Sequence, residues 1–230
     1  MSRITGRGIE KRLTSARIMK IKRKVEPYSI KAKPGAHPRD RSAPLGFVIR
    51  DMLGIAKNLK ETNFLLNARK VEVNGTAETS YKLPVGLFDV VGVPEIKKKY
   101  RMILDAQGRL EAEEMEEKES TEKYCKVVNK RMVTGKKVEI TTEDGRTFGL
   151  DNEKVNVGDT IKVKFPEQKI VKTIKMEKGK NAYVISGKHA GKTVKILDVI
   201  PGTIQKEKLV SLEDGKNTLE TVASNIIAIE

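Results

Sequence analysis

The sequence contains no tryptophan, one cysteine and two histidines, and only five phenylalanines and five tyrosines among its 230 residues. Aromatic side chains supply much of the apolar area of large cores, so their scarcity favours several small modules built on Val, Ile and Leu. The single cysteine, Cys125, excludes an internal disulfide, and it has no nearby Cys or His with which to bind a metal. We interpret Cys125 as a small, buried apolar side chain.

Long apolar runs are also missing. No run approaches the roughly 20 residues needed to span a bilayer, and residues 1–10 lack the apolar stretch of a secretory signal. We therefore expect a cytoplasmic protein with no membrane partner. The sequence offers no set of Ser, His and Asp, no acid–base pair and no cluster of metal ligands. We accordingly expect no catalytic residue, no metal, no cofactor, no small-molecule substrate and no homo-oligomer.

Positive charge is abundant and unevenly placed. Lys and Arg number 46 against 31 Asp and Glu, a surplus of 15 that favours a polyanion as the partner, nucleic acid first and an acidic membrane second. Residues 1–42 alone carry 13 Lys and Arg against three acids. Within them "KPGAHP" at 33–38 opposes both helix and strand. We predict an extended basic arm that becomes ordered against phosphate; the alternative is a solvated tail.

Apolar residues in that segment recur at spacings of three to five, which is compatible with a short amphipathic helix through Ile9, Leu13, Ile18 and Ile21. Farther along, residues 43–57 place apolar side chains on one helical face, and a second helix is expected to begin near Leu59. Val71 and Val73 then alternate with polar residues before the turn dipeptide Asn74-Gly75. The order helix, helix, hairpin is typical of a compact RNA-binding module.

Beyond Pro94 the pattern changes to β-type alternation, interrupted by the acidic stretch "EAEEMEEKE" at 111–119, for which we expect a helix or a solvated loop. A hairpin is predicted over Asp144-Gly145, and two further strands should flank residues 166–168. These strands are expected to bury Val138, Ile140, Leu150, Ile161, Val163, Phe165, Ile170 and Ile174.

The stretch "SGKHAGKT" at 186–193 is similar to the phosphate-binding loop of NTPases. Only three residues separate Gly187 from Gly191, where that motif has four, and the alternation after Thr193 indicates a strand instead of the required helix. We therefore predict no binding of ATP or GTP. Gly191 is expected to need a positive backbone angle or a close approach that a Cβ would forbid.

Several segments carry a resemblance to known families. "RSAPLGFVIRDMLGIAK", "KVEVNG" and "KLPVGLFDVV" resemble the S-four type RNA-binding domain, and "NAYVISGKHAGKTVKILDVIPG" resembles the KOW motif, whose required glycine matches Gly191. With "KRL" at 11–13 and "KPGAHP" at 33–38, their order is similar to the archaeal and eukaryotic small-subunit ribosomal protein S-four-e family. The family often carries Pro-Lys-x-Trp after its Lys-Arg-Leu, whereas this chain has no Trp. The absence of a long C-terminal extension favours the archaeal type.

The resemblance implies an α+β, multi-module fold. The expected modules are a basic N-terminal arm (1–42), an S-four type domain of two helices and a hairpin (43–92), a central β domain (93–175) and an SH3-like KOW barrel (176–230). The function implied is that of a non-catalytic constituent of the small ribosomal subunit, with ribosomal RNA and neighbouring ribosomal proteins as partners. The alternative is a KOW-bearing translation or transcription factor that binds RNA transiently. A pseudouridine synthase is disfavoured, because "GRLEAEE" at 108–114 has Glu where its catalytic Asp is wanted.

The residues expected to contact RNA are the cations and histidines of the arm, of the two-helix module and of the KOW turn, while two glycines are expected to form structural turns at 75 and 191. The RNA-contacting candidates are Lys11, Arg12, Arg17, Lys20, Lys22, Arg23, Lys24, Lys33, His37, Arg39, Arg41, Arg50, Lys57, Lys60, Arg69, Lys70, Lys82, Lys188, His189 and Lys192.

Overall fold

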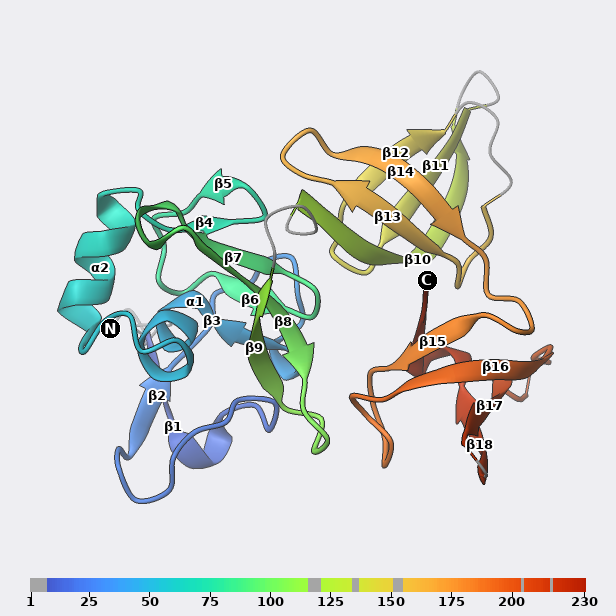
Figure 1. Ribbon diagram of the computed structural model, residues 1–230, viewed down its shortest axis with the longest axis horizontal. Coiled ribbons are helices and arrows are strands. Elements are labelled where there is room, and N and C mark those ends of the chain that lie inside the picture. The colour runs from blue at the N-terminus through green and yellow to red at the C-terminus, as the bar shows by residue number, and fades with distance from the viewer. Residues whose placement is uncertain (1–7, 116–120, 134–136, 151–154, 204, 216) are drawn as a thin grey trace, which may run out of the picture. The chain divides into compact units, whose positions relative to one another are not determined.

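The computed structural model describes residues 8–115, 121–133, 137–150, 155–203, 205–215 and 217–230 (Figure 1). The described chain is mostly β-structure with few helices. It divides into two compact units, of which unit 1 comprises residues 1–103 and 109–121, and unit 2 comprises residues 104–108 and 122–230. Among the described residues, no helix combines the length and the apolar character needed to cross a bilayer.

Two short helices lie in unit 1, as the sequence predicted. Helix α1 (Leu45–Phe47) continues as one π-helical stretch, Val48–Met52, and α2 spans Leu59–Asn67. The side chain of Asn58 caps α2 by accepting a hydrogen bond from the Glu61 amide at 2.9 Å. The first helix ends at Met52, five residues before the predicted end. Its predicted apolar face is nevertheless buried, with Leu45, Val48 and Ile49 fully enclosed.

A five-stranded sheet follows in the order β5-β4-β7-β8-β9. Strands β4 (Glu72–Val73) and β5 (Thr76–Ala77) form the hairpin predicted over Asn74-Gly75, and both turn residues have positive φ, 52° and 74°. Strands β7 (Val90–Val93), β8 (Lys98–Leu104) and β9 (Leu110–Met115) complete the sheet, which extends beyond residue 92.

Strand β9 corrects the expectation of a helix or loop for the acidic stretch, of which residues 116–119 lie outside the described ones. Glutamate has low strand propensity, but pairing with β8 places Glu114 3.0 Å from the Lys98 ammonium. Leu110 at the start of β9 is buried. Tertiary pairing therefore overrides local propensity here.

The N-terminal segment also differs from its prediction. Strand β1 (Ile9–Lys11) pairs antiparallel with β2 (Tyr28–Ile30), and a 3-10 helix follows at Arg12–Thr14. The predicted amphipathic helix is absent from these residues, and Leu13 is 91% exposed. Ile18, Met19 and Ile30 are buried, so residues 8–42 contribute side chains to the core of unit 1, which an extended arm would not do. Strand β3 (Ser42–Pro44) then pairs with β6 (Pro84–Gly86).

Unit 2 contains a central sheet with the strand order β12-β11-β10-β13-β14. Its strands are β10 (Glu122–Val133), β11 (Lys137–Thr142), β12 (Thr147–Leu150), β13 (Thr160–Lys164) and β14 (Lys169–Ile174). The predicted hairpin over Asp144-Gly145 and the strands on either side of residues 166–168 are confirmed. The predicted core is also confirmed: Ile140, Leu150, Ile161, Val163, Phe165 and Ile174 are buried, Val138 and Ile170 pack against the cluster, and Cys125 is buried among them.

A C-terminal sheet with the order β18-β17-β16-β15-β19 completes unit 2. Its strands are β15 (Asn181–Val184), β16 (Thr193–Ile200), β17 (Leu209–Asp214), β18 (Asn217–Val222) and β19 (Ile226–Ile229). Strand β16 begins directly after Lys192, so a strand follows the glycine loop, as predicted from the sequence.

Candidate nucleic-acid interface

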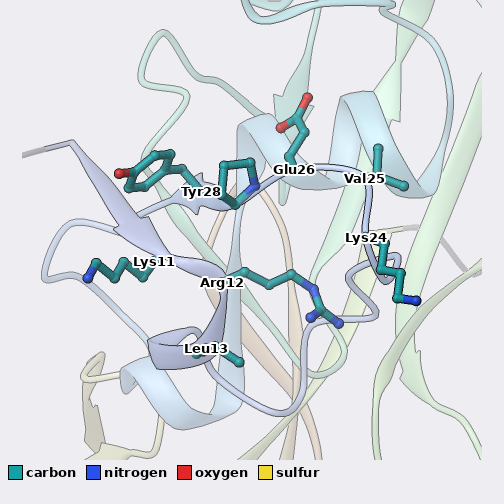
Figure 2. A pocket seen from close by; sticks show the side chains of 8 residues that line it. Lys11, Arg12, Leu13, Lys24, Val25, Glu26 and Tyr28 are labelled. Atoms are coloured by element: carbon teal, nitrogen blue, oxygen red, sulfur yellow. The ribbon is translucent and has the colours of Figure 1, made fainter.

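A hollow of about 530 Å³ lies on unit 1 between the 3-10 helix after β1 and the segment that leads into β2. We call it the basic hollow, and Figure 2 shows its lining side chains. The hollow is lined by Lys11, Arg12, Leu13, Lys24, Val25, Glu26, Pro27 and Tyr28. It thus brings together three of the predicted RNA-contacting residues, Lys11, Arg12 and Lys24.

Local backbone structure explains how these residues come together. The β1–β2 register places Lys11 directly opposite Tyr28, and the Arg12 amide donates to the Pro27 carbonyl at 3.0 Å. Lys24 has a left-handed backbone conformation, with φ of 57°, which turns the chain back toward β2. The β1–β2 pairing and the turn at Lys24 therefore hold residues 11–13 and residues 24–28 on either side of one hollow.

The lining combines cations with exposed apolar and aromatic side chains. Three cations face one carboxylate, Glu26, which lies 3.7 Å from the guanidinium of Arg50. Leu13, Val25 and Tyr28 are 91%, 66% and 51% exposed. Cations bind phosphate, while an exposed tyrosine ring offers a face on which a base can stack.

Arg12 crosses the basic hollow toward the segment that carries Lys24 (Figure 2). Its Nε atom is buried and has no hydrogen-bond partner among the described residues. A buried donor without an acceptor carries a desolvation cost.

Arg50 occupies a different environment from the cations of the basic hollow. It pairs with Asp51 at 2.8 Å, and the pKa of Arg50 is raised, first by this hydrogen bond and to a smaller extent by the charges of Asp51 and Glu26. Four other candidates are also paired with acids: Lys20 with Glu111, Arg39 with Glu10, Lys70 with Glu95 and Lys192 with Asp214. To bind phosphate, each of these cations must either release its carboxylate partner or contact the carboxylate and the phosphate together.

The remaining candidates lie elsewhere on the two units. Lys82 stacks on the Tyr81 ring, 5.4 Å from its centroid. Arg41 and His189 are partly buried, and the other candidates are exposed, namely Arg17, Lys22, Arg23, Lys33, Lys57, Lys60, Arg69 and Lys188.

His37 is a correction to the predicted set. Its Nε2 lies 2.8 Å from Asp89 Oδ2, and the two side chains are only 7% and 3% exposed. Asp89 also accepts hydrogen bonds from the Gly86 amide and the Asn74 side-chain amide, each at 2.7 Å. A Cβ at Gly86 would stand 2.5 Å from the His37 ring. His37 is thus a packed internal residue of unit 1 and is not free to contact RNA.

The glycine loop at residues 186–192 lies in unit 2. Gly191 has φ of +84°, and a Cβ there would lie 2.5 Å from the Asp105 carbonyl oxygen. The positive angle and the close approach, which the sequence offered as alternatives, therefore both occur. Lys188 is exposed beside this turn.

Sequence reasoning missed Tyr28 and Val25 as lining residues of the basic hollow. They are an apolar and an aromatic residue within a segment rich in Lys and Arg, and this combination was the signal that the sequence offered.

Comparison with known proteins gives matches over most of the chain. A family model described as "Ribosomal family S4e" matches residues 96–170, and a KOW motif matches residues 178–213. The small ribosomal subunit protein eS4 of Nanoarchaeum equitans is 39% identical, over 94% of this chain and 93% of its own. The protein of the same name from Methanosphaera stadtmanae is 33% identical, over 95% and 90%.

A solved structure agrees with these relatives. The crystal structure of the 30S ribosomal protein S4e from Thermoplasma acidophilum superposes with a TM-score of 0.72 at 30% identity, covering 83% of this chain and 95% of that one. The similarity therefore extends from sequence to fold and includes both the segment of the family model and the KOW motif. The chain belongs to the ribosomal S4e family.

Proposed function

We propose that this chain is a structural constituent of the small ribosomal subunit that binds ribosomal RNA and supports translation. The observation that carries the proposal is the 39% identity to a small ribosomal subunit protein over 93% of that protein's length. The net charge of +15 and the basic hollow supply the chemistry that RNA binding needs. The protein acts without catalysis, in contact with neighbouring ribosomal proteins, in the cytoplasm.

The proposal includes an arrangement of modules. Residues 43–92 form an S-four type RNA-binding domain, residues 93–175 a central β domain and residues 176–230 an SH3-like KOW barrel. Residues 1–42 contribute the basic hollow and, through Ile18 and Ile30, part of a core. Lys188 and His189 present a second basic surface at the KOW turn. RNA contact by the exposed candidate cations belongs to this proposal.

Binding to RNA should lose part of its salt dependence when the basic hollow loses its charge. We expect the Lys11→Ala, Lys24→Ala double variant of the full chain to lower the slope of log affinity against log salt by about 2, because each phosphate contact contributes about one unit. The measurement is a salt series with an in-vitro transcript of the small-subunit ribosomal RNA of Methanosphaera stadtmanae, a relative's source organism.

The matched control is the Lys31→Ala, Lys97→Ala double variant, which removes the same charge from exposed positions of unit 1 outside the hollow. Equal slopes for the hollow variant and the wild-type chain would reject the hollow as a phosphate site. A second test is co-sedimentation of the protein with small ribosomal subunits in high salt. Loss of the protein from the subunits would favour a transiently bound factor over an integral ribosomal protein.

A further inference from the structure

The last six residues of β10, Val128–Val133, are all exposed although they belong to a paired strand. We call them the β10 tip. A strand that lies on a core alternates buried and exposed residues, so exposure on both faces means that the tip projects beyond the core of the central sheet. Val128, Met132 and Val133 are 53%, 76% and 44% exposed. Met132 and Val133 are adjacent in the strand, so both faces of the tip expose a large apolar side chain.

One edge of the β10 tip has no neighbouring strand among the described residues. Strand β13 pairs only with Glu122–Lys126, whereas β11 pairs with β10 from Val127 to Val133. An open edge is a template for a further protein strand, but two features oppose strand addition here. The register shifts at Val128, which is an extra residue between two paired ones, and the Lys130 amide donates to Asn129 Oδ1 at 2.8 Å. The edge is therefore interrupted and partly capped.

The charge of the β10 tip indicates which partner fits it. Lys130 and Arg131 are adjacent in the strand and therefore point to opposite faces. Arg131 pairs across the hairpin with Glu139, at 2.5 Å, and Lys130 is exposed. A narrow ribbon with cations on both faces and apolar side chains beside them suits RNA, whose phosphates bind cations and whose riboses and unstacked bases accept apolar contacts.

We propose that the β10 tip is an RNA-binding ribbon, separate in the chain from the basic hollow and from the 186–192 loop. Lys130 and Arg131 contact phosphates, and Met132 and Val133 pack against ribose or base faces. The inference rests on the proposed function for the presence of an RNA partner, and it adds a contact surface that the KOW turn does not provide.

The test uses the full chain and the same ribosomal RNA transcript across a salt series. For the Lys130→Ala, Arg131→Ala double variant we expect roughly tenfold weaker binding near 0.1 M salt and a slope lower by about 2. For the Met132→Ser, Val133→Ser double variant we expect weaker binding with an unchanged slope, since no ionic contact is lost. Thermal unfolding of both variants should match the wild-type chain, because the substituted side chains are exposed.

The matched control is the Lys164→Ala, Lys169→Ala double variant, which removes two exposed cations from β13 and β14 of the same sheet. Lys169 pairs with Glu167 as Arg131 pairs with Glu139. An equal loss of binding in this control would show a general effect of charge and overturn the proposal. Tip variants that bind like the wild type would overturn it too, while leaving the proposed function intact. A wild-type chain that fails to bind the transcript would overturn both.

A crosslinking measurement distinguishes RNA from a protein strand. Cys125 is buried, so a photo-crosslinker can be attached selectively to a Met132→Cys variant assembled into small subunits. We expect it to label ribosomal RNA at a discrete position. Labelling of a neighbouring protein alone would mean that the open edge accepts a strand and would overturn the proposal.

Discussion

Replacing Lys126 by methionine is expected to lower the free energy of unfolding of unit 2 by about 3 kcal/mol. Lys126 lies on β10 and is only 7% exposed. Its ammonium donates to three backbone carbonyls, those of Ala223 at 2.6 Å, Ser224 at 3.0 Å and Ile226 at 2.7 Å. These carbonyls belong to the 3-10 helix Ala223–Asn225 and the first residue of β19. One side chain of the central sheet thus holds the entrance to the last strand of the C-terminal sheet.

The expected loss of stability follows from counting the hydrogen-bond donors and acceptors around Lys126. An ammonium has three donors, and here each meets a carbonyl oxygen. Methionine fills a similar volume and removes the cost of burying a charge, but it leaves three carbonyls without this donor. The bond to Ile226 is buried and the bonds to Ala223 and Ser224 are part-buried. An unsatisfied buried acceptor costs about 1 to 3 kcal/mol, and the two part-buried carbonyls add a smaller cost, so the loss should exceed the gain.

The measurement is calorimetric unfolding of the full chain, with Lys172→Met as the control. Lys172 is an exposed lysine of the same unit, paired with Glu230, and its replacement should change stability by less than about 0.5 kcal/mol. We also expect the Lys126 variant to unfold over a broader range, because the link between the two sheets is weakened. An unfolding curve that overlays that of the wild type would show that the three hydrogen bonds contribute no net stability.

Lys126 also illustrates what the sequence could not predict. Alternating apolar residues and turn dipeptides act locally, and they correctly predicted the hairpins over Asn74-Gly75 and Asp144-Gly145. The partners of a buried polar group lie about a hundred residues away in the chain. No local pattern distinguishes Lys126, which binds carbonyls, from the exposed lysines around it.

The wrong secondary-structure predictions fall in segments whose local sequence signals conflict with their tertiary contacts. The glutamates of β9 disfavour a strand, yet the strand forms because β8 supplies a pairing edge and a lysine. In the N-terminal segment the many charged residues led to the prediction of an extended arm that contributes nothing to a core. Ile18 and Ile30 are nevertheless buried, and the Ile18 carbonyl accepts a hydrogen bond from Leu110. A few apolar residues in contact with a distant strand suffice to order a basic segment.

The sequence predicted which types of residue would form the candidate interface, but it did not predict how they lie relative to one another. Composition predicted Lys11, Arg12 and Lys24 as RNA-contacting cations, and their contact with RNA stays a prediction. Their meeting in one hollow with Tyr28 depends on the β1–β2 register, which the charged sequence does not specify. His37 differs from these cations: its side chain could bind RNA, but in the fold it contacts Asp89 inside unit 1.

The second large effect is expected at Gly191, where alanine should lower the free energy of unfolding by about 2 kcal/mol more than alanine at Gly187 does. Both glycines lie in the same loop and have positive φ, +84° and +101°. Alanine therefore strains the backbone at both positions. A Cβ at Gly187 meets nothing within 4 Å, whereas at Gly191 it would lie 2.5 Å from the Asp105 carbonyl oxygen and 2.8 Å from that of Leu104. The Gly187→Ala variant thus measures the backbone strain alone, and the difference measures the close approach.

The close approach is costly only if the backbone at residues 104–105 is held in place, and the hydroxyl of Tyr183 holds it. This hydroxyl accepts from the Leu104 amide at 2.9 Å and donates to the Leu104 carbonyl at 3.2 Å. In a Tyr183→Phe background the segment can move away from the new methyl group, so the penalty of Gly191→Ala should shrink while that of Gly187→Ala stays constant. The measurement is a double-mutant cycle by thermal unfolding of the full chain, since residues 104–108 are part of the contact. Equal destabilisation by the two alanines would mean that the loop tolerates a Cβ and that the glycine serves the positive angle alone. A cycle with no coupling between Gly191 and Tyr183 would mean that the Tyr183 hydroxyl does not hold residues 104–105 in place.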